Sequence, residues 1–426
     1  PVRAAGLPAL TRALPHPLPI RRLFPGLLLG ALGLLFSLPG SAQGSWQARA
    51  TPTYAYPDLI GCATFTIDSI AYLAGGFSVL GPEGSCHELW AYNPRTDTWS
   101  QKADLYSTGR PAAFVLDHKG YVTLGMGASF AVGGVWYPTD MYAYDPVVNQ
   151  WTPRAPFPAP GRHFPACFVI GNLAYVGLGS STGPATGHTD WYAYDPVSDS
   201  WSAKASFPGQ NHAASASFTI GGMGYVAGGV DGNTGTPSAQ VWRYDPVADA
   251  WTRKNDLPAP RAAPGCFLLQ GDAYVMGGFL SLTQTTATTY NSLLKYQPAT
   301  DSWRPQAPLG TQGRMSPIAF AVGQYAYVGG GEASRPWSVI SDFWRYSTAL
   351  QSAAADQPAG PVSLWPNPTP GPLHLRGLES PAALYDRQGR LIRTLRPGQA
   401  TADLTDLPPG VYTLQGPGLT RRVVRD

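Results

Sequence analysis

The chain has 426 residues, of which 49 are glycine, 43 are proline and only 13% are charged. This composition is typical of a turn-rich all-β protein and argues against long charged helices. The formal net charge is +3, but residues 43–360 carry 17 basic and 21 acidic side chains, so this region lacks the basic surface expected of a nucleic-acid-binding protein.

Residues 1–42 show the three zones of a secretory signal peptide. Arg21 and Arg22 precede an apolar run over residues 23–38, and the small residues 40–42 complete a cleavage site. A membrane anchor is the alternative, but an apolar run of this length, interrupted by proline and glycine, is short for a transmembrane helix. We therefore predict an N-terminal extension with a signal peptide, export, and no permanent membrane span.

A pattern with a period of about fifty residues runs through residues 43–350. In each copy a tyrosine stands seven residues before a tryptophan. The complete pairs are Tyr92 and Trp99, Tyr144 and Trp151, Tyr194 and Trp201, Tyr244 and Trp251, and Tyr296 and Trp303. The sixth pair is split, because Tyr346 has no tryptophan after it and Trp46 has no tyrosine before it. The sequence therefore predicts a ring that closes by joining its two ends.

Each copy also contains the signals of a β-hairpin. A phenylalanine stands seven residues before a tyrosine, with a polar or glycine-containing turn between them. These pairs are Phe65 and Tyr72, Phe114 and Tyr121, Phe168 and Tyr175, Phe218 and Tyr225, Phe267 and Tyr274, and Phe320 and Tyr327. Glycines, a variable loop, a strand with alternating aromatic residues and the tryptophan strand follow. We therefore predict four antiparallel strands per copy.

The paired glycines, the tyrosine and the tryptophan at this spacing resemble kelch repeats. The resemblance covers about residues 43–350 and implies a six-bladed β-propeller. It also implies that the strand of Trp46 completes the blade that contains Tyr346.

The tail differs from the repeats. We predict a linker over residues 351–360 and a small all-β domain over residues 361–426, where short strands alternate with proline and glycine. The order of its motifs resembles the C-terminal sorting domain of the type IX secretion pathway of Bacteroidetes, a small β-sandwich. That resemblance implies the type IX secretion machinery as a partner, passage through the periplasm, and a secreted or cell-surface location.

Several cationic residues stand just before the predicted inner strands, where propeller ligands usually bind. They are Arg110, Arg162, His212, Arg261 and Arg314. One interpretation is a cationic collar that holds a carboxylate, since the guanidinium group matches two oxygens at once. The alternative is that these residues only stabilise the connections between blades.

The loops between the second and third strands should reach the same face. The loop residues that we expect to contact a glycan or a protein partner are Trp136, Tyr137, Arg335 and Trp337. Ordinary loop anchoring is the alternative. The acidic residues that recur four positions before the blade tyrosine are Glu88, Asp140, Asp190 and Asp342. Their recurrence favours a repeated structural hydrogen bond over catalysis.

The four cysteines fit no zinc pattern. Cys167 and Cys266 stand where other copies carry small residues, which predicts buried free thiols. Cys62 and Cys86 could meet on one face, which leaves a disulfide and two separate thiols as alternatives.

These patterns favour an exported binding module for an extracellular glycan or protein, with no metal and no cofactor expected. The histidines lack the spacing of metal ligands, and we assign no catalytic residue. The alternative is a carbohydrate-active enzyme that resembles bacterial kelch proteins acting on sialic acid, a mutarotase or epimerase. In such an enzyme the collar would hold the carboxylate, and His163, His212 or a loop acid would move protons.

Overall fold

The fold is known from a computed structural model. It describes residues 44–51, 59–78, 84–106, 108–128, 134–181, 187–231, 234–283, 286–333 and 338–348 of the repeats, and 363–365, 369, 372–376, 378, 381–386, 390–416 and 419–425 of the tail. The secondary structure of these residues is entirely β, which confirms the predicted fold class. The predicted signal peptide and linker lie outside the described residues.

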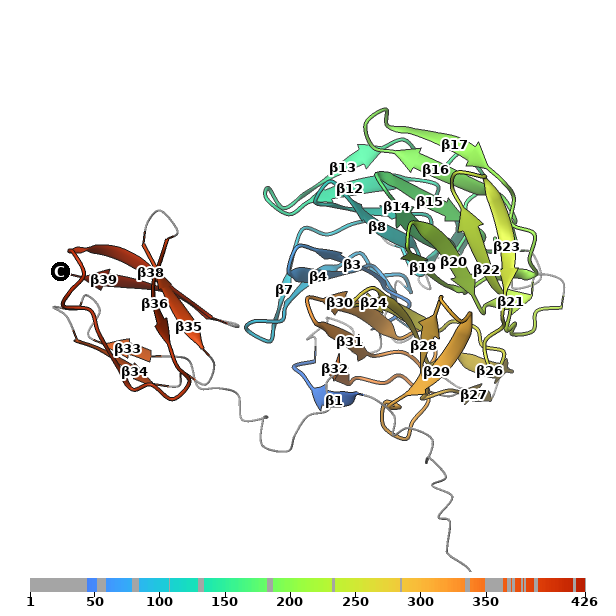
Figure 1. Cartoon of the computed structure of the whole chain (residues 1–426). Helices are drawn as coiled ribbons and strands as arrows, with labels where there is room; N and C mark the ends of the chain where they lie inside the picture. The colour runs from blue at the N-terminus through green and yellow to red at the C-terminus, as the bar shows by residue number, and fades with distance from the viewer. Residues whose placement is uncertain are drawn as a thin grey trace, which may run out of the picture. The chain divides into compact units, whose positions relative to one another are not determined.

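The repeats form four-stranded antiparallel sheets around a common centre (Figure 1). Among the described residues there are six such sheets in this region, which we number as blades 1 to 6. From the inner to the outer strand, blade 1 contains β3 (Ala63–Ile67), β4 (Ile70–Ala74), β6 (Leu89–Asn93) and β7 (Thr98–Gln101), and blade 2 contains β8 (Ala112–Leu116), β9 (Lys119–Thr123), β12 (Met141–Asp145) and β13 (Gln150–Arg154). Blade 3 contains β14 (Ala166–Ile170), β15 (Leu173–Gly177), β16 (Trp191–Asp195) and β17 (Ser200–Lys204), and blade 4 contains β19 (Ala216–Ile220), β20 (Met223–Ala227), β22 (Val241–Asp245) and β23 (Ala250–Lys254). Blade 5 contains β24 (Gly265–Leu269), β25 (Asp272–Met276), β28 (Leu293–Gln297) and β29 (Ser302–Gln306), and blade 6 contains β30 (Ile318–Val322), β31 (Tyr325–Gly329), β32 (Phe343–Ser347) and β1 (Ser45–Ala48).

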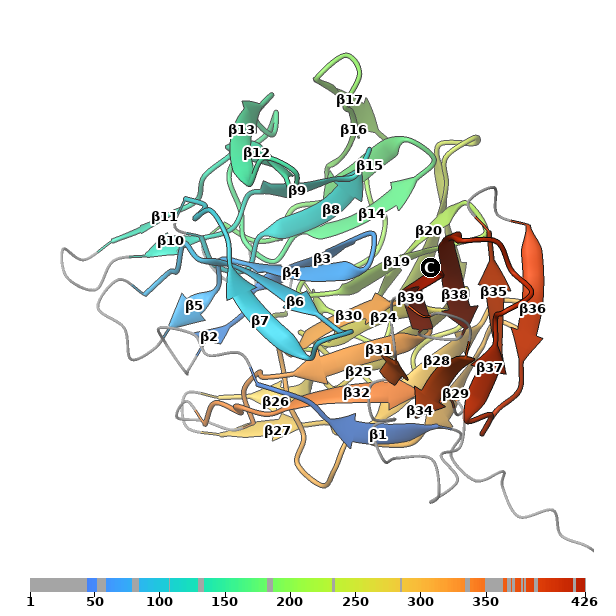
Figure 2. The ribbon, with the colours of Figure 1, turned by 90° about the vertical axis from the view of Figure 1, so that its left-hand side faces the viewer.

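Short strands extend the loops between the second and third strands and, as β2 and β18, the segments that lead into two inner strands. They pair as β2 (Leu59–Ile60) with β5 (Phe77–Ser78), β10 (Gly127–Ala128) with β11 (Val135–Trp136), β18 (Asn211–Ala213) with β21 (Val230–Asp231), and β26 (Phe279–Leu282) with β27 (Ala287–Thr289). Figure 2 shows β2, β5, β10, β11, β26 and β27 on one side of the blades. We call this side the loop face. The turns between third and fourth strands lie on the opposite side, the turn face.

The repeated tyrosine joins neighbouring blades through an acidic or amide side chain five residues later. The pairs, with O···O distances of 2.6–2.7 Å, are Tyr92 and Asp97, Tyr144 and Asn149, Tyr194 and Asp199, Tyr244 and Asp249, and Tyr296 and Asp301. The same side chain also accepts a hydrogen bond from a backbone amide at the end of the preceding blade, as Asp199 does from Ala155 at 3.0 Å. Although burial alone would raise the pKa of Asp199, the bonds from Tyr194 and Ala155 hold it below its ordinary value.

The repeated tryptophan binds the same segment of the preceding blade. Trp201 donates its indole N–H to the carbonyl oxygen of Ala155 at 3.0 Å, and Trp151, Trp251 and Trp99 make the corresponding bond in their blades. We call this set of tyrosine, acid or amide, and tryptophan the inter-blade latch. It explains physically why these three residue types recur at fixed spacing.

The two ends of the repeat region close the ring. Strand β1 pairs antiparallel with β32, and Trp46 lies opposite Tyr346 with ring centroids 4.9 Å apart. The Trp46 indole donates to the carbonyl oxygen of Ala307 in blade 5 at 2.8 Å, and the Trp99 indole of blade 1 donates to Ala50 of blade 6 at 2.9 Å. The predicted joining of the split sixth copy is therefore confirmed.

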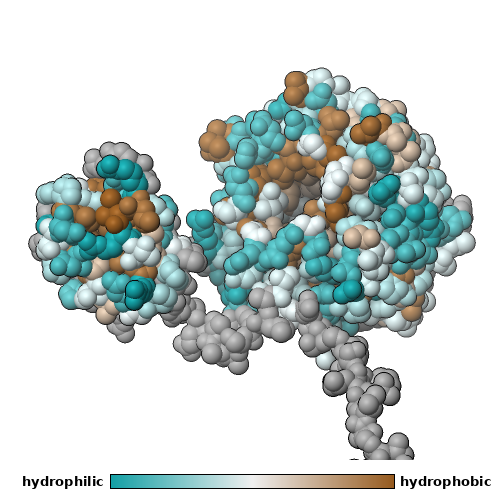
Figure 3. Space-filling model, viewed as in Figure 1, coloured by the Kyte–Doolittle hydropathy of each residue, from teal (hydrophilic) through white to brown (hydrophobic). Residues whose placement is uncertain are grey.

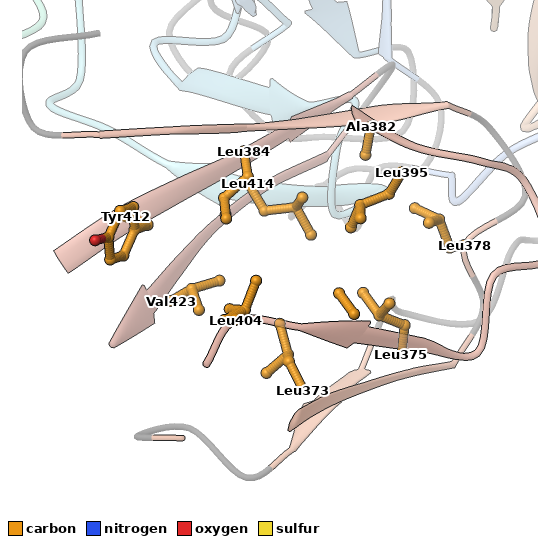
Figure 4. Close-up of a cluster of buried hydrophobic side chains, with 11 residues drawn as sticks. Leu373, Leu375, Leu378, Ala382, Leu384, Leu395, Leu404, Tyr412, Leu414 and Val423 are labelled. Atoms are coloured by element: carbon orange, nitrogen blue, oxygen red, sulfur yellow. The ribbon is translucent and has the colours of Figure 1, made fainter. Parts of the chain in front are cut away.

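The tail forms a small sandwich of two sheets. One contains β33 (Ser363–Trp365), β34 (Pro372–Arg376) and β37 (Thr401–Asp403), and the other contains β36 (Leu391–Leu395), β35 (Ala382–Tyr385), β38 (Gly410–Gly416) and β39 (Leu419–Arg425). Figure 4 shows Leu373 and Leu375 of the first sheet facing Leu384 and Leu414 of the second. These leucines are buried, so the tail has a hydrophobic core of its own.

Candidate functional site

A ring of backbone hydrogen bonds surrounds the channel on the loop face, at the residue that stands two positions before each inner strand. We call these residues the mouth ring: Gly61, Arg110, Phe164, Ala214, Ala263 and Ser316, all with φ between 49 and 63°. Along five links, from Arg110 to Ser316, each amide donates to the carbonyl oxygen of the ring residue in the preceding blade, at 2.7–3.3 Å. Non-glycine residues adopt this left-handed conformation at a cost of about 1 kcal/mol each. Since the backbone alone makes the ring, its side chains are free to differ.

A cavity of about 530 Å³ lies above the mouth ring, a size suited to a small organic ligand. Its walls come from the loop-face strands β21 and β26 and from ring residues of several blades. Much of the lining is apolar, including Val230, Phe279, Leu280 and Met315. Figure 3 shows the opposite opening of the channel, where hydrophobic residues also gather in the central hollow.

Arg110 brings a positive charge into this cavity. It is the only charged member of the mouth ring. Its guanidinium carbon lies 4.8 Å from the ring centroid of Phe164 and 5.5 Å from that of Phe77, which are cation–π distances. The two aromatic rings therefore orient Arg110 at the junction of the cavity and the channel below it, whose lining it shares.

His163 lines the same cavity beside Arg110. Its backbone pairs with Ser180, and its imidazole stacks on Tyr137 with centroids 5.5 Å apart. Burial, and then the charge of Arg110, lower the pKa of His163 to about 4, so the imidazole is neutral at physiological pH. Its Nδ1 is buried and has no hydrogen-bond partner among the described residues.

Three arginines of the predicted collar are buried instead. Arg162 is fully buried and binds both carboxylate oxygens of Asp190, and Arg314 does the same with Asp342 at 2.6 and 2.8 Å. Arg261 donates to the carbonyl oxygen of Gly277 and to Ser292. Each links the start of an inner strand to the start of the third strand in its own blade. These three arginines therefore have a structural role, which was the alternative to ligand binding, and the five predicted residues do not form a cationic collar.

The collar prediction combined two different positions of the repeat. Arg162, Arg261 and Arg314 each donate to a carbonyl sixteen residues later, and in blade 2 the residue that does so is Thr108 rather than Arg110. Arg110 stands two positions further along, in the mouth ring. The backbone of His212 lies in β18 at the position of Arg162, and its side chain is outside the described residues.

The loop candidates have different outcomes. Tyr137 reaches the cavity region through its stack on His163, whereas Trp136 is 46% exposed and lies against Gly127 of its own hairpin. Arg335 and Trp337 lie outside the described residues.

Among the recurring acidic residues, Asp190 and Asp342 make structural bonds to arginines, as predicted, and Glu88 accepts a hydrogen bond from the Trp90 indole at 2.9 Å. Sequence reasoning missed the apolar wall of Phe279, which no repeat signal marks.

Of the two alternatives for Cys62 and Cys86, the structure has two separate thiols and no disulfide between them. Burial raises the pKa of the Cys62 thiol, and the nearby Cys86 adds to this shift. Cys167 and Cys266 are also thiols, as predicted, and they donate to backbone carbonyls of the preceding blade at 3.2 and 3.3 Å. These thiols thus serve blade packing.

Within the described residues, no group of His, Cys, Asp or Glu side chains has the arrangement of a metal site. The same residues contain no helix of the length and hydropathy that a membrane span requires.

Comparison with known proteins agrees with the fold. The Kelch motif matches residues 60–105 and 214–258. The solved structure of YjhT superimposes with a TM-score of 0.59 and 14% sequence identity, over 69% of this chain and 95% of that chain. The sheets and the likeness to YjhT define a β-propeller, and the family match shows that this propeller contains Kelch motifs. At this level of identity the likeness to YjhT concerns the fold alone.

Proposed function

We propose that this protein is an exported binding module whose ligand enters the cavity on the loop face. The observation that carries the proposal is the cavity itself, in which Arg110 and the neutral His163 meet an apolar wall above the mouth ring. A mostly apolar pocket with a few convergent polar groups is the usual form of a small-ligand site. The recurring polar and aromatic residues of the blades, in contrast, bind one another in the inter-blade latches.

Blocking the cavity tests this proposal. Ser281 lines the cavity and is exposed on β26, so Ser281→Trp should fill the entrance without disturbing the blade core. Binding found in a screen of glycans and small organic acids with the full-length protein should be lost in this variant. The matched control is Ser198→Trp, at an exposed turn on the turn face, which should bind normally. Equal binding by both variants would contradict a loop-face site.

The export route is the second part of the proposal. Support comes from the tail, which has its own two-sheet sandwich and its own core, as a separable address would need. Deletion of residues 361–426 should leave the protein inside the outer membrane, as measured by fractionation and immunoblotting. Unchanged appearance of the deleted protein outside the outer membrane would refute the sorting role and leave the binding role untouched.

A mutarotase or epimerase acting on an acidic sugar is the second candidate. The observation that favours it is that His163 and Glu332, two residues able to move protons, line one cavity with Arg110. Exchange of sugar anomers followed by NMR, with and without the protein, tests it. Acceleration that disappears in His163→Gln would support the enzyme, and an unchanged exchange rate would refute it.

A further inference from the structure

We infer that the ligand of the loop-face cavity is a small amphipathic carboxylic acid, with its carboxylate against Arg110 and its apolar body along β26. The inference rests on the proposed function and deepens it by naming the class of ligand. Aryl and alkyl carboxylic acids belong to this class, and polyhydroxylated sugar acids do not.

The mouth ring shows where the charge is placed. At the other five ring positions the side chains are uncharged, so Arg110 departs from the pattern of the repeat. It does so at a position where the left-handed backbone already costs stability, and such positions cluster at functional sites. The guanidinium group offers the fork of N–H donors that matches a carboxylate.

The neutral state of His163 strengthens the same assignment. Because His163 is uncharged at physiological pH, it adds no second cation that would call for a phosphate or another dianion. The charged residues among the described lining are Arg110 and the buried Glu332. One carboxylate on the ligand would therefore match the one guanidinium group of the described lining, and the Glu332 carboxylate disfavours a second negative charge on the ligand.

The wall of the cavity indicates the body of the ligand. Val230, Phe279 and Met315 are buried there, and on β26 Leu280 and Leu282 remain 42% and 38% exposed at the rim. Aliphatic and aromatic carbons offer no hydrogen-bond partner. Each sugar hydroxyl pressed against such a wall would lose its water without compensation, whereas an aryl or alkyl group gains about 25 cal/mol for each Å² buried.

Three matched probes test this inference by calorimetry on the full-length protein. They are 3-phenylpropionate, its neutral amide 3-phenylpropionamide, and glucuronate. We expect 3-phenylpropionate to bind with a Kd of about 1 mM or below. The amide and glucuronate should each bind about tenfold more weakly or worse, because one lacks the charge and the other lacks the apolar body.

Variants locate the two contacts. Arg110→Gln should weaken binding of 3-phenylpropionate about tenfold or more and remove the preference for acid over amide, and Arg110→Lys should keep part of that preference. Arg95→Gln, at an exposed turn, is the matched control and should bind as the native protein does. Leu282→Ser should weaken the aryl acid, while Val197→Ser, which changes a 91% exposed residue, should not. Circular dichroism confirms that each variant is folded.

The outcomes separate this inference from the proposed function. Glucuronate binding more tightly than 3-phenylpropionate, with loss in Ser281→Trp, would overturn the ligand class and leave the binding module standing. Equal affinity for acid and amide would overturn the role of Arg110. Binding that Ser281→Trp does not affect would overturn both the ligand class and the loop-face site. A tenfold loss in Glu332→Gln would overturn the carboxylate assignment, since removing a negative charge should not weaken an anion.

Discussion

The turn face and the loop face of the propeller use the same repeat in opposite ways. On the turn face most latch residues hydrogen-bond to a defined partner, as Tyr194 does with Asp199 and Trp201 with Ala155, and the buried indole of Trp303 is an exception among the described residues. On the loop face the backbone makes the mouth ring, and the side chains there range from glycine to Arg110. Residues that recur therefore hold the blades together, and residues that break the recurrence are the candidates for function.

The largest effect should come from the seam of the ring. Trp46→Ala removes the ring that packs on Tyr346 and the indole N–H that bonds to Ala307, so we expect a loss of about 3 kcal/mol in the free energy of unfolding. Trp136→Ala, which truncates a 46% exposed tryptophan on the loop face, should cost less than about 1 kcal/mol. Urea denaturation measures both. Equal losses would show that the seam is no more important than a loop.

The next effect compares two arginines. Arg162→Met leaves Asp190 without its buried cation and should destabilise the protein by about 3 kcal/mol. The same change at Arg110 should cost less than about 1 kcal/mol and should instead remove carboxylate binding. Stability and binding measured on both variants decide the matter. If Arg110→Met were as destabilising as Arg162→Met, both arginines would be structural.

The third effect concerns pH and His163. Burial and the charge of Arg110 lower the pKa of His163 from 6.5 to about 4 in the folded protein. Between these values the unfolded chain binds a proton that the folded chain does not. The free energy of unfolding therefore does not depend on His163 well above pH 6.5, and it falls by about 3 kcal/mol through His163 as the pH drops to 4.

Urea denaturation across this pH range checks the prediction. His163→Gln should flatten the profile between pH 6.5 and 4. His118→Gln, which changes an exposed histidine paired with Asp68, should leave the slope as it is. A profile that stays equally steep in His163→Gln would contradict the neutral buried imidazole.

The smallest effect belongs to a single latch. Tyr194→Phe deletes only the hydroxyl that bonds to Asp199 and should cost about 1 kcal/mol. Tyr192→Phe, two residues away on the same strand, is the matched control and should change stability by less. A neutral result for Tyr194→Phe would mean that water replaces the latch bond at no cost.

The framework could be predicted from the sequence because each of its signals is local or periodic. The seven-residue spacing from Tyr194 to Trp201 places both residues across one turn, and the register of β16 and β17 sets them opposite each other. The split copy gave the pairing of Trp46 with Tyr346, since a period that is complete except at its ends has only one way to close.

The candidate site could be predicted only in part, because its geometry depends on loops that do not repeat. Arg110 stands two residues before its inner strand and Arg162 stands four residues before its own, and this difference places Arg110 at the cavity and buries Arg162. Phe279 and Leu282 carry no repeat signal. Their contribution to the cavity arises from the β26–β27 hairpin, which blade 5 forms in its own loop.

A crystal structure of the full-length protein with 3-phenylpropionate would test the central claim most directly. We predict a carboxylate within hydrogen-bonding distance of Arg110, a phenyl ring against β26, and an unchanged ion pair between Arg162 and Asp190. Electron density for the ligand only outside the loop-face cavity, or a carboxylate bound by a displaced Arg162, would contradict it.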